Sequence, residues 1–500
     1  MIYSINLGIG WASSGVEYAQ IYRAKMLRNI KQSAKFIFTD MFPVENIEHM
    51  TRNIGFEDDE VIWLYTYFTD REIAPVTYTL DMLEKTFHTT QFNKSRNGKV
   101  VKYQFEGRNN FYTAYMTDET GDRVHRVELV SRGFLIRKDY YTDSRLYSEY
   151  YAPLDDAAHL YQRRFFNKNG TVAYEEIIDD NNAMYKFPDV MVCSKAELVE
   201  LMLRKMDLTE KDILLIDRTT GIGQAILSSG TKAKKGIIIH ADHYSERNAN
   251  EENILWNNYY EYSFDMHKHI DFYVTATEVQ KKILAEQFME VYGAKPKIFA
   301  IPVGSLKELK VPGENGRRKH SLITASRLAT EKHVDWLVRA VKIARETVPD
   351  ITLDIYGKGG EEDKISDLIK ELELEDSVRL MGQHDMTDIY QDYEAYYSGS
   401  QSEGFGLTLM EAIGAGLPII GFDVRYGNRN FIENGRNGYL IGVDDDTDQK
   451  DKIRMLAEAA VKLFTEADMD EFHHNSYEKA REYLTEEVGL KWKRLIAQMM

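Results

Sequence analysis

The sequence has 500 residues, which suggests two or three domains, and 43% of them are apolar, enough for ordinary globular cores. Its formal net charge of −17 argues against a general nucleic-acid binder, which needs a basic face. Cys193 is the only cysteine, so the sequence excludes a disulfide framework and fits a reducing compartment. The start lacks the pattern of a signal peptide, and no apolar run approaches the roughly 18 residues of a membrane span. We therefore expect a soluble, cytoplasmic protein.

The first segment has the pattern of a β-α-β unit. Residues 2–7 alternate like a strand, a helix is predicted from about 14 to 29, and SAKFIFTD (33–40) predicts a second strand. The run VIWLYTYF (61–68) predicts a further strand. This order is typical of a parallel sheet.

Between about residues 97 and 187 the pattern changes. Short runs rich in aromatic and β-branched residues are separated by polar turns such as DETGD and NKNG, which predicts an antiparallel meander. About a third of the tyrosines fall here, so one face is either a contact surface or a thin sheet that tyrosines cover. The two interpretations stand equal at this point.

The α/β pattern then resumes. SKAELVELMLRKM predicts a helix. DILLID and KGIIIH predict strands, and the second strand ends at His240, a possible ligand residue. Residues 310–321 have the composition of a linker, and a second α/β domain begins at SLITAS. The last stretch, from residue 477 on, is predicted to be helical. We therefore predict two Rossmann-like α/β domains, with a β-rich insert in the first. Ligands of such sheets bind beyond the carboxyl ends of the strands.

Two cations follow the strand SLITAS. Arg327 comes directly after it and Lys332 five residues later. Two cations at a strand end can neutralise a diphosphate, and the Arg guanidinium can do so with two hydrogen bonds. The alternative is an ordinary surface pair near the start of a helix, although cations there oppose the helix dipole.

The segment SEGFGLTLMEA carries the second group of candidates. Gly404 and Gly406 allow close approach of the backbone to a ligand, and a helix predicted from Leu407 offers free N–H groups to an anion. Glu403 and Glu411 lie on either side of this helix start, where carboxylates can accept hydrogen bonds from sugar hydroxyls. The alternative is a helix with two solvated glutamates.

The second half of the chain resembles a known family. SRLATEKH, IYGKGG, VRLMGQ, SEGFGLTLMEA and NGRNGYLI, in this order, resemble the C-terminal half of retaining glycosyltransferases with the GT-B fold. The resemblance implies that Glu403 contacts the donor sugar, that Glu411 contacts the ribose, and that Arg327 and Lys332 bind the diphosphate. It also implies that no metal is needed. The acidic run 444–446 could imitate a metal motif but is expected to face solvent.

The first half narrows the resemblance. INLGIGWASSGVEYA, IDRTTGIGQ, HADHYSE, ILWNNYYEY and the β-rich insert are similar to the GtfA family, the catalytic subunits of a two-protein O-GlcNAc transferase of the accessory Sec system. The resemblance implies transfer of GlcNAc from UDP-GlcNAc to Ser or Thr hydroxyls of serine-rich repeat adhesins, with retention at the anomeric carbon. It also implies a related, non-catalytic GT-B-like partner subunit, with peripheral contact to the cytoplasmic membrane face left open.

The expected domains follow from both lines of reasoning. Residues 1–70 and 190–305 form an N-terminal Rossmann-like domain on the acceptor side, closed by a C-terminal helix at about 478–500. Residues 71–189 form the β-rich insert, which is expected to contact the partner and to cradle the acceptor. Residues 318–477 form the domain that binds the nucleotide sugar.

Further candidates lie in loops. The glycines 8, 10 and 15 have a G-x-G-x4-G spacing, one residue too long for a dinucleotide loop. We expect this loop, and Gly15 above all, to face the donor phosphate and the acceptor.

His240 ends the strand KGIIIH and is a catalytic candidate that would hydrogen-bond the donor sugar or the leaving group. His243 is either a ligand or structural, and His384 either places its backbone against the uracil or is a plain loop residue. The predicted donor-binding set comprises Gly15, Arg327, Lys332, His384, Glu403, Gly404, Phe405, Gly406, Leu407 and Glu411; the catalytic set comprises His240, Arg327, Lys332 and Glu403.

The sequence marks no carboxylate nucleophile, so front-face substitution is the favoured mechanism, with the leaving UDP helping to deprotonate the acceptor. Three alternatives remain. A wall teichoic acid GlcNAc transferase would need a basic acceptor groove, which fits poorly with a strongly acidic chain. A non-catalytic partner subunit need not keep the two glutamates and two cations. A nicotinamide-dependent enzyme would leave the SEGFGLTLMEA segment unexplained.

Overall fold

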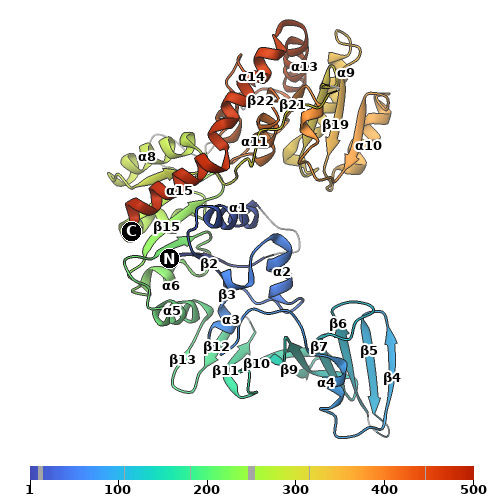
Figure 1. Ribbon diagram of the computed structural model, residues 1–500, viewed down its shortest axis with the longest axis vertical. Coiled ribbons are helices and arrows are strands. Elements are labelled where there is room, and N and C mark those ends of the chain that lie inside the picture. Colours follow the sequence, from blue (N-terminus) through green and yellow to red (C-terminus); the bar gives the residue numbers. More distant parts are fainter. Residues whose placement is uncertain are drawn as a thin grey trace.

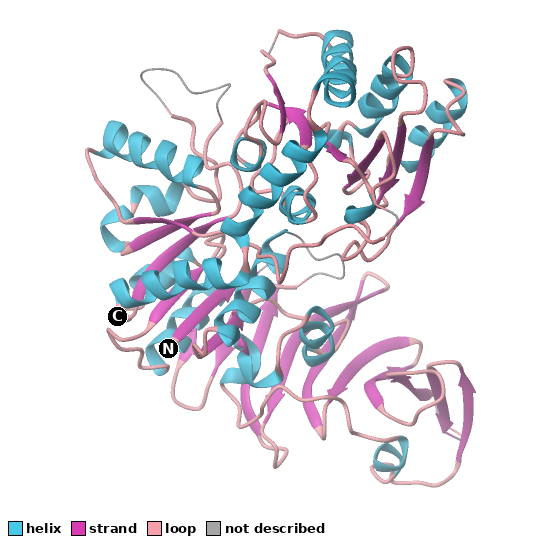
Figure 2. Ribbon diagram, turned by 45° about the horizontal axis from the view of Figure 1, so that its top comes forward, coloured by secondary structure: helices cyan, strands magenta, loops and turns pink. Residues whose placement is uncertain are grey.

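Three β-sheets organise the chain in the computed structural model, which describes residues 1–9, 15–105, 107, 109–180, 182–245, 254–314, 316–444 and 446–500. Two of the sheets are parallel, with seven and six strands, and one is antiparallel with ten. Figure 1 shows the six-stranded sheet at the top, the seven-stranded sheet in the middle and the antiparallel sheet below. Helices pack around both parallel sheets, whereas few lie along the antiparallel one (Figure 2).

The seven-stranded sheet has the order β17-β16-β15-β14-β1-β2-β3. The chain extends it first to one side of β1 and later to the other, so the order reverses between β1 and β14. The carboxyl ends of these two strands therefore flank a crevice of the kind that binds ligands. The strands are β1 (Ile2–Asn6), β2 (Ala34–Phe38), β3 (Val61–Trp63), β14 (Ile213–Ile216), β15 (Lys234–Ile239), β16 (Phe272–Thr275) and β17 (Ile298–Ala300); the helices are α1 (Gly15–Asn29), α2 (Ile47–Ile54), α5 (Lys195–Lys205), α6 (Gly223–Ser228), α7 (Glu261–Asp265) and α8 (Glu278–Tyr292).

The strand predicted over residues 61–68 is wrong in its second half. Only Val61–Trp63 pairs with β2, and Leu64–Tyr67 form the short helix α3. Leu64, Tyr65 and Thr66 are all buried, and the Tyr174 hydroxyl of the antiparallel sheet donates to Tyr65 O at 2.7 Å. The Tyr65 ring stacks on Phe165 of the antiparallel sheet, so contact with the insert turns the chain here.

The antiparallel sheet runs from β13 to β4 without interruption. An aromatic ladder crosses its strands: Tyr140 stacks on Tyr147 at 4.3 Å between ring centroids, and Phe165 stacks on Tyr174 at 4.5 Å. These rings are buried in one core with the first parallel sheet. The rings of this ladder therefore pack the antiparallel sheet against the first parallel sheet, and the two interpretations of the tyrosines stay open for the rest of the insert. The elements are α4 (Leu80–Glu84), β4 (Phe92–Asn97), β5 (Val100–Phe105), β6 (Asn110–Met116), β7 (Val124–Ser131), β8 (Phe134–Tyr141), β9 (Arg145–Leu154), β10 (Ala157–Phe166), β11 (Val172–Asp179), β12 (Asn182–Lys186) and β13 (Met191–Val192).

The six-stranded sheet has the order β20-β19-β18-β21-β22-β23. Its order reverses between β18 and β21, so the second crevice lies at the carboxyl ends of these strands. The elements are β18 (Ser321–Ala325), α9 (Val334–Ala344), β19 (Thr352–Tyr356), α10 (Glu362–Glu371), β20 (Val378–Gly382), β21 (Ala395–Tyr397), α11 (Leu407–Gly414), β22 (Ile419–Phe422), α12 (Gly427–Phe431), β23 (Gly438–Ile441), α13 (Gln449–Glu466) and α14 (Met469–Ala480).

The chain crosses between the two parallel sheets twice. Leu306 lies in the first crossing and contacts the second crossing through two hydrogen bonds. Its N–H donates to Tyr483 O at 2.8 Å, and its carbonyl accepts from Thr485 N at 2.9 Å. The predicted terminal helix is therefore broken, because Leu484 takes an extended conformation to pair with Leu306. Beyond it, α15 (Thr485–Met499) lies beside α1 and β15 in Figure 1.

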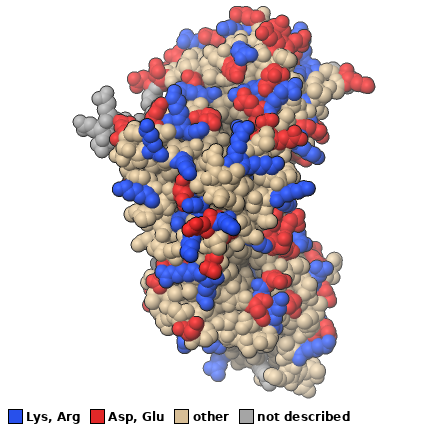
Figure 3. Space-filling model, turned by 60° about the vertical axis from the view of Figure 1, so that its left-hand side comes forward, with Lys and Arg blue, Asp and Glu red and all other residues tan. Residues whose placement is uncertain are grey.

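The apolar side chains of α15 complete the core of the first sheet. Val488, Trp492 and Leu495 are buried together with Ile2 and Met26. The exact boundaries of the domains stay a prediction. On the face in Figure 3, acidic and basic side chains are interspersed. Within the described part of the chain, none of the helices has both the length and the apolar character that a membrane span requires.

Candidate active site

The second crevice collects most of the predicted donor-site residues. Arg327 and Lys332 follow β18, and Glu403 follows β21, so they reach the point where the order of the six-stranded sheet reverses. The helix α11 begins directly behind Glu403, at Leu407. The strand ends therefore bring together residues that lie 71 positions apart in the chain.

An ion pair lies at the centre of this crevice. Lys332 Nζ is 2.7 Å from Glu403 Oε2, and both side chains are about one-fifth exposed (19% and 21%). The backbone of Glu403 is fixed as well, because its carbonyl accepts from Tyr426 N at 2.8 Å and from Gly427 N at 2.7 Å. Gly399 lies against the loop that carries Lys332, where an added Cβ would come within 2.9 Å of Lys332 O. The pair is therefore held from both sides.

The start of α11 depends on Gly406. This residue has φ +88°, a left-handed conformation that L-residues with side chains rarely adopt, and an added Cβ would come within 2.7 Å of Leu409 Cδ1. Phe405 turns its ring into the core, where it packs edge-on against Phe431 at 5.1 Å. Only the backbone of Phe405 is thus available to a ligand, next to the free N–H groups of the helix start.

Glu411 differs from Glu403 because no cation among the described residues pairs with it. Tyr390 donates its hydroxyl to Glu411 Oε2 at 3.2 Å. Burial raises the pKa of Glu411 to about 7. Burial also raises the pKa of Tyr22 to about 12, and the Glu411 charge adds to that rise, so α1 of the first sheet lies close to this carboxylate.

Three predicted residues lie apart from this cluster. The Arg327 side chain is 78% exposed and pairs with Glu331 at 3.1 Å, so it does not touch Lys332 or Glu403. His384 makes a local contact, because its Nε2–H donates to the Met381 carbonyl at 2.9 Å. Gly15 opens α1 in an exposed position. Gly10 of the same loop lies outside the described residues.

His240 supplies the facing side of the site. It follows β15, and its Nε2 lies 2.8 Å from Oδ1 of Asp217, which follows β14. An added Cβ on Gly404 would lie 3.4 Å from His240 O, so the loop before α11 approaches the end of β15. The two crevices therefore face each other across Gly404 and His240.

His243 is structural. It is fully buried, with Nε2 2.8 Å from Gln287 Oε1 and Nδ1 3.0 Å from the Tyr426 hydroxyl. Burial lowers the pKa of His243 to about 4. Because Tyr426 belongs to the second parallel-sheet region, this histidine joins the two regions.

The chemistry of the donor set suits a nucleotide sugar. A cation and helix N–H groups can balance a diphosphate, and two carboxylates can accept hydrogen bonds from hydroxyl groups. Among the described residues, no three His, Cys, Asp or Glu side chains are grouped closely enough to hold a metal ion. Asp445, in the acidic run, lies outside the described residues.

The sequence reasoning missed three residues of this region. Asp217 and Arg23 contact each other beneath His240, and Tyr390 contacts Glu411. A signal for Asp217 was present, since this carboxylate ends the strand DILLID in the same way as His240 ends KGIIIH. Arg23 and Tyr390 carry no such signal, because each lies in a helical segment without a distinctive spacing.

Two parallel-sheet domains whose strand ends face one another, with a cation–glutamate pair at a glycine-rich helix start, define a glycosyltransferase of the GT-B fold. Two family profiles match the chain: "GtfA extended beta-sheet domain" over residues 93–189 and "Glycosyl transferases group 1" over residues 307–481. A relative from Streptococcus gordonii, named as the GtfA subunit of UDP-N-acetylglucosamine–peptide N-acetylglucosaminyltransferase, is 50% identical over 499 residues, covering 100% of this chain and 98% of the relative. The chain belongs to this family of GtfA subunits.

Solved structures agree with this assignment. The structure of a GtfA/B complex matches with a TM-score of 0.97 at 50% identity, covering 100% of this chain and 99% of the solved chain. The pneumococcal O-GlcNAc transferase GtfA, solved with UDP and GlcNAc, matches with a TM-score of 0.89 at 45% identity, covering 100% and 98%. The family resemblance and the GT-B fold with its β-rich insert, both expected from the sequence, are confirmed.

Proposed function

We propose that this chain transfers GlcNAc from UDP-GlcNAc to Ser or Thr hydroxyls of a peptide, with retention at the anomeric carbon. The observation that carries the proposal is the Lys332–Glu403 pair, 2.7 Å apart, held at the strand ends beside the start of α11. It supplies charges for a diphosphate and a sugar in one place. The pneumococcal relative that was solved with UDP and GlcNAc supports the choice of donor.

The donor would lie across the start of α11. Lys332 and the helix N–H groups would bind the diphosphate, and Arg327 is free to reach it by exchanging its exposed pair with Glu331. Glu403 would accept hydrogen bonds from the sugar and Glu411 from the ribose. Gly404 and Gly406 would let the backbone approach, Phe405 and Leu407 would contribute backbone N–H groups, and His384 would border the base. Gly15 would lie against the donor phosphate from the other domain.

The reaction would proceed by front-face substitution. The bond between the anomeric carbon and the β-phosphate oxygen breaks, and the acceptor oxygen bonds to the same face of that carbon. The hydroxyl proton passes to the departing phosphate oxygen. Lys332, Arg327 and the helix N–H groups would stabilise the charge that develops on UDP, and His240 would hydrogen-bond the sugar. No bound metal enters this scheme.

The proposed acceptor is a serine-rich adhesin polypeptide, and the proposed partner is a related, non-catalytic subunit. A relative with the same fold was solved as a GtfA/B complex, which supports a two-protein enzyme. The β-rich insert at residues 71–189 is our candidate for the contact with partner and acceptor. We place the reaction in the cytoplasm, with peripheral contact to the membrane face as part of the same proposal.

The test measures UDP release from UDP-GlcNAc and the intact mass of a serine-rich peptide, with and without the partner subunit. We expect one HexNAc per event in the wild type. Glu403→Ala and Lys332→Ala should each lower turnover by about 100-fold, in the range seen when a group that stabilises transition-state charge is removed. Lys364→Ala is the matched control. It also removes a lysine from an ion pair, the 2.8 Å contact with Glu361, but this pair lies at the start of α10 and not at the Lys332–Glu403 pair.

Two results would contradict the proposal. The first is near-normal turnover of Lys332→Ala in a folded preparation, which would remove the pair from the site. The second is transfer to a polyol-phosphate polymer but not to peptide, even with the partner present. That result would move the function to the teichoic acid alternative and leave the donor site in place.

A further inference from the structure

We infer that Asp217 and Arg23 are positioning residues that fix the imidazole of His240 for transfer. This inference rests on the proposed function and extends it to side chains that lie behind the site. The observation is a buried chain of contacts: Arg23 on α1 pairs with Asp217 at the end of β14, and Asp217 contacts His240 at the end of β15.

Asp217 is the centre of this network and is fully buried. Its Oδ2 accepts from Ser4 Oγ at 2.6 Å, Gln20 Nε2 at 2.9 Å and Arg23 Nη1 at 3.2 Å. Its Oδ1 accepts from Arg23 Nη2 at 2.5 Å and lies 2.8 Å from His240 Nε2. Burial alone would raise the pKa of Asp217, but Arg23 and His240 hold that pKa well below its usual range. The carboxylate therefore stays ionised.

An ionised carboxylate can only accept hydrogen bonds, so the contact with Asp217 requires a hydrogen on His240 Nε2. The neutral imidazole then has its lone pair on Nδ1. The His240 backbone is held too, because its N–H donates to the Tyr260 hydroxyl at 2.8 Å. Asp217 thus fixes the side chain and the tautomer of His240, and Tyr260 fixes its main chain.

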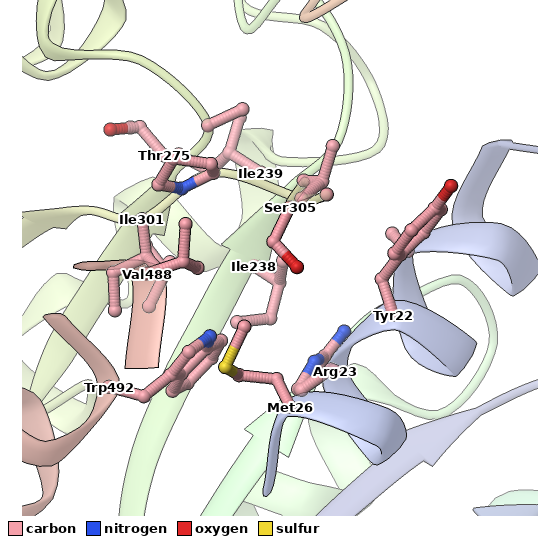
Figure 4. A pocket seen from close by; sticks show the side chains of 16 residues that line it. Tyr22, Arg23, Met26, Ile238, Ile239, Thr275, Ile301, Ser305, Val488 and Trp492 are labelled. Atoms are coloured by element: carbon pink, nitrogen blue, oxygen red, sulfur yellow. The ribbon is translucent and has the colours of Figure 1, made fainter. Parts of the chain in front are cut away.

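Arg23 acts on the site only through Asp217. Its side chain is 4% exposed, and Figure 4 shows it projecting from α1 into a pocket that Trp492 and Ile238 also line. This pocket has a volume of about 20 Å³, which holds one water molecule and excludes a sugar or a nucleotide. Because its guanidinium is buried and bound to Asp217, we infer that the role of Arg23 is to hold the carboxylate that holds the imidazole.

The location makes this support useful. The loop before α11 approaches the end of β15, where an added Cβ on Gly404 would lie 3.4 Å from His240 O. A rotation of the imidazole would change the hydrogen-bonding group at the point where the two crevices meet. Carboxylates that orient a metal-bound histidine cost roughly 10-fold to 100-fold in affinity or activity when removed, and we expect a loss in this range here.

The test is a double-mutant cycle on turnover with UDP-GlcNAc, using Asp217→Asn, His240→Ala and the double variant of the full chain. We expect Asp217→Asn to lower kcat by at least about tenfold with KM for the donor changed less. In the His240→Ala background the same substitution should change kcat by less than about twofold, because its target is gone. Glu176→Gln is the matched control, since it removes the charge from a buried carboxylate that lies 2.9 Å from Arg163 in the antiparallel sheet.

Equal losses in both backgrounds would overturn the inference, because Asp217 would then act on stability or on another group. If Asp217→Asn does not fold, Arg23→Lys replaces it in the cycle, because lysine keeps the charge but cannot hold both carboxylate oxygens. A second readout does not depend on turnover. In ¹⁵N NMR of the wild type at about pH 8.5, above the ordinary pKa of histidine, the signals that disappear in His240→Ala should show a protonated Nε2 and an unprotonated Nδ1.

The opposite tautomer would overturn the inference whatever the turnover. Failure of the proposed function appears differently: the wild type itself would transfer no HexNAc to peptide. The NMR result would still decide whether Asp217 fixes the imidazole.

Discussion

At the scale of single residues, the two glutamates of the candidate site show how environment separates identical side chains. Glu403 has Lys332 at 2.7 Å and keeps an ion-pair partner. Glu411, eight positions later, accepts from the Tyr390 hydroxyl with no cation among the described residues beside it, and burial raises its pKa to about 7. The Glu403 carboxylate therefore has an ion-pair partner in the protein, whereas we propose that the Glu411 carboxylate finds its partner in the hydroxyl groups of a bound ligand.

The raised pKa of Glu411 predicts a pH-dependent stability. The folded protein binds a proton there more tightly than the unfolded chain, so the stabilisation is complete below the unfolded pKa of about 4.3 and is lost as pH rises toward 7. Glu411→Gln removes this loss. At about pH 8 we expect the variant to exceed the wild type in stability by up to about 4 kcal/mol, at 1.36 kcal/mol per pKa unit, and at pH 4 to show little advantage.

Thermal unfolding at both pH values without ligand measures this difference. Glu371→Gln is the control, because it makes the same chemical change on the exposed side of α10. A constant difference between Glu411→Gln and wild type at both pH values would show that Glu411 does not titrate in this range.

At the scale of elements, the loop from β21 to α11 carries the site. Gly406 has to be left-handed for α11 to begin at Leu407, and the loop before it has to pass close to the end of β15. The two glycines thus have different reasons to lack a side chain. Gly406 is needed because the backbone is left-handed there. Gly404 is needed because the end of β15 passes close to it.

This difference predicts opposite outcomes for two alanine substitutions. Gly406→Ala should lower the unfolding free energy by about 1–3 kcal/mol, because alanine is disfavoured at φ +88° and its Cβ meets Leu409 at 2.7 Å. Gly404→Ala meets only an ordinary 3.4 Å contact, so stability should hold, while kcat/KM for UDP-GlcNAc falls about tenfold because the backbone can no longer approach the donor.

Denaturant unfolding and steady-state rates on the same preparations separate the two effects. Each variant is the control for the other. A Gly404→Ala protein that unfolds early yet keeps its kcat/KM would reverse the assignment of the two glycines.

At the scale of the whole molecule, the two parallel sheets are joined by more than a linker. His243 and Tyr426 make a buried contact between them, and the Ser402 hydroxyl donates to Asp242 Oδ2 at 3.2 Å. The paired crossings at Leu306 and Leu484 run side by side. Beyond them, α15 packs into the core of the first sheet, although the second sheet lies between the two in the sequence.

This packing predicts that a change in α15 destabilises the first sheet. Trp492 is 5% exposed and buried with Ile2 and Met26, so Trp492→Ala should cost about 3–5 kcal/mol, as for other buried aromatic residues. Leu490→Ala is the matched control on the same helix, because Leu490 is 42% exposed. Amide hydrogen exchange should show the loss of protection in β1 and β14.

Loss of protection confined to the six-stranded sheet would contradict this prediction, since it would place the helix with the wrong domain. An equal loss of hydrogen-exchange protection in both parallel sheets would show that they unfold as one unit. The comparison with Leu490→Ala would still measure the contribution of Trp492 to stability.

Elements whose signals are local in the sequence were predicted correctly, whereas elements that depend on distant partners were not. Strand, glycine turn and helix at residues 395–414 were predicted correctly because their signals are local. The helix at Leu64–Tyr67 and the break at Leu484 were not, because each depends on a partner far away, Phe165 in one case and Leu306 in the other. Local alternation and periodicity carry no information about such partners.

The same limit applies to the site. Lys332 and Glu403 were found because each follows a strand and fits a family motif. Asp217 and Arg23 are separated by 194 positions, so only the fold reveals that they share one network with His240. The roles of the predicted site residues stay predictions that the experiments above address.

The position of α15 also has a consequence for synthesis. Protein chains leave the ribosome from the N-terminus, and domains generally fold in that order. Here the first sheet cannot cover one of its apolar faces until residues 485–499 have emerged, about 180 residues after its last strand, β17, has been made. We therefore expect nascent chains to expose Ile2, Met26 and their neighbours while the six-stranded sheet is still being translated. In that interval we expect chaperones to bind the exposed apolar face, and the first sheet to reach its final stability only after the last helix has docked.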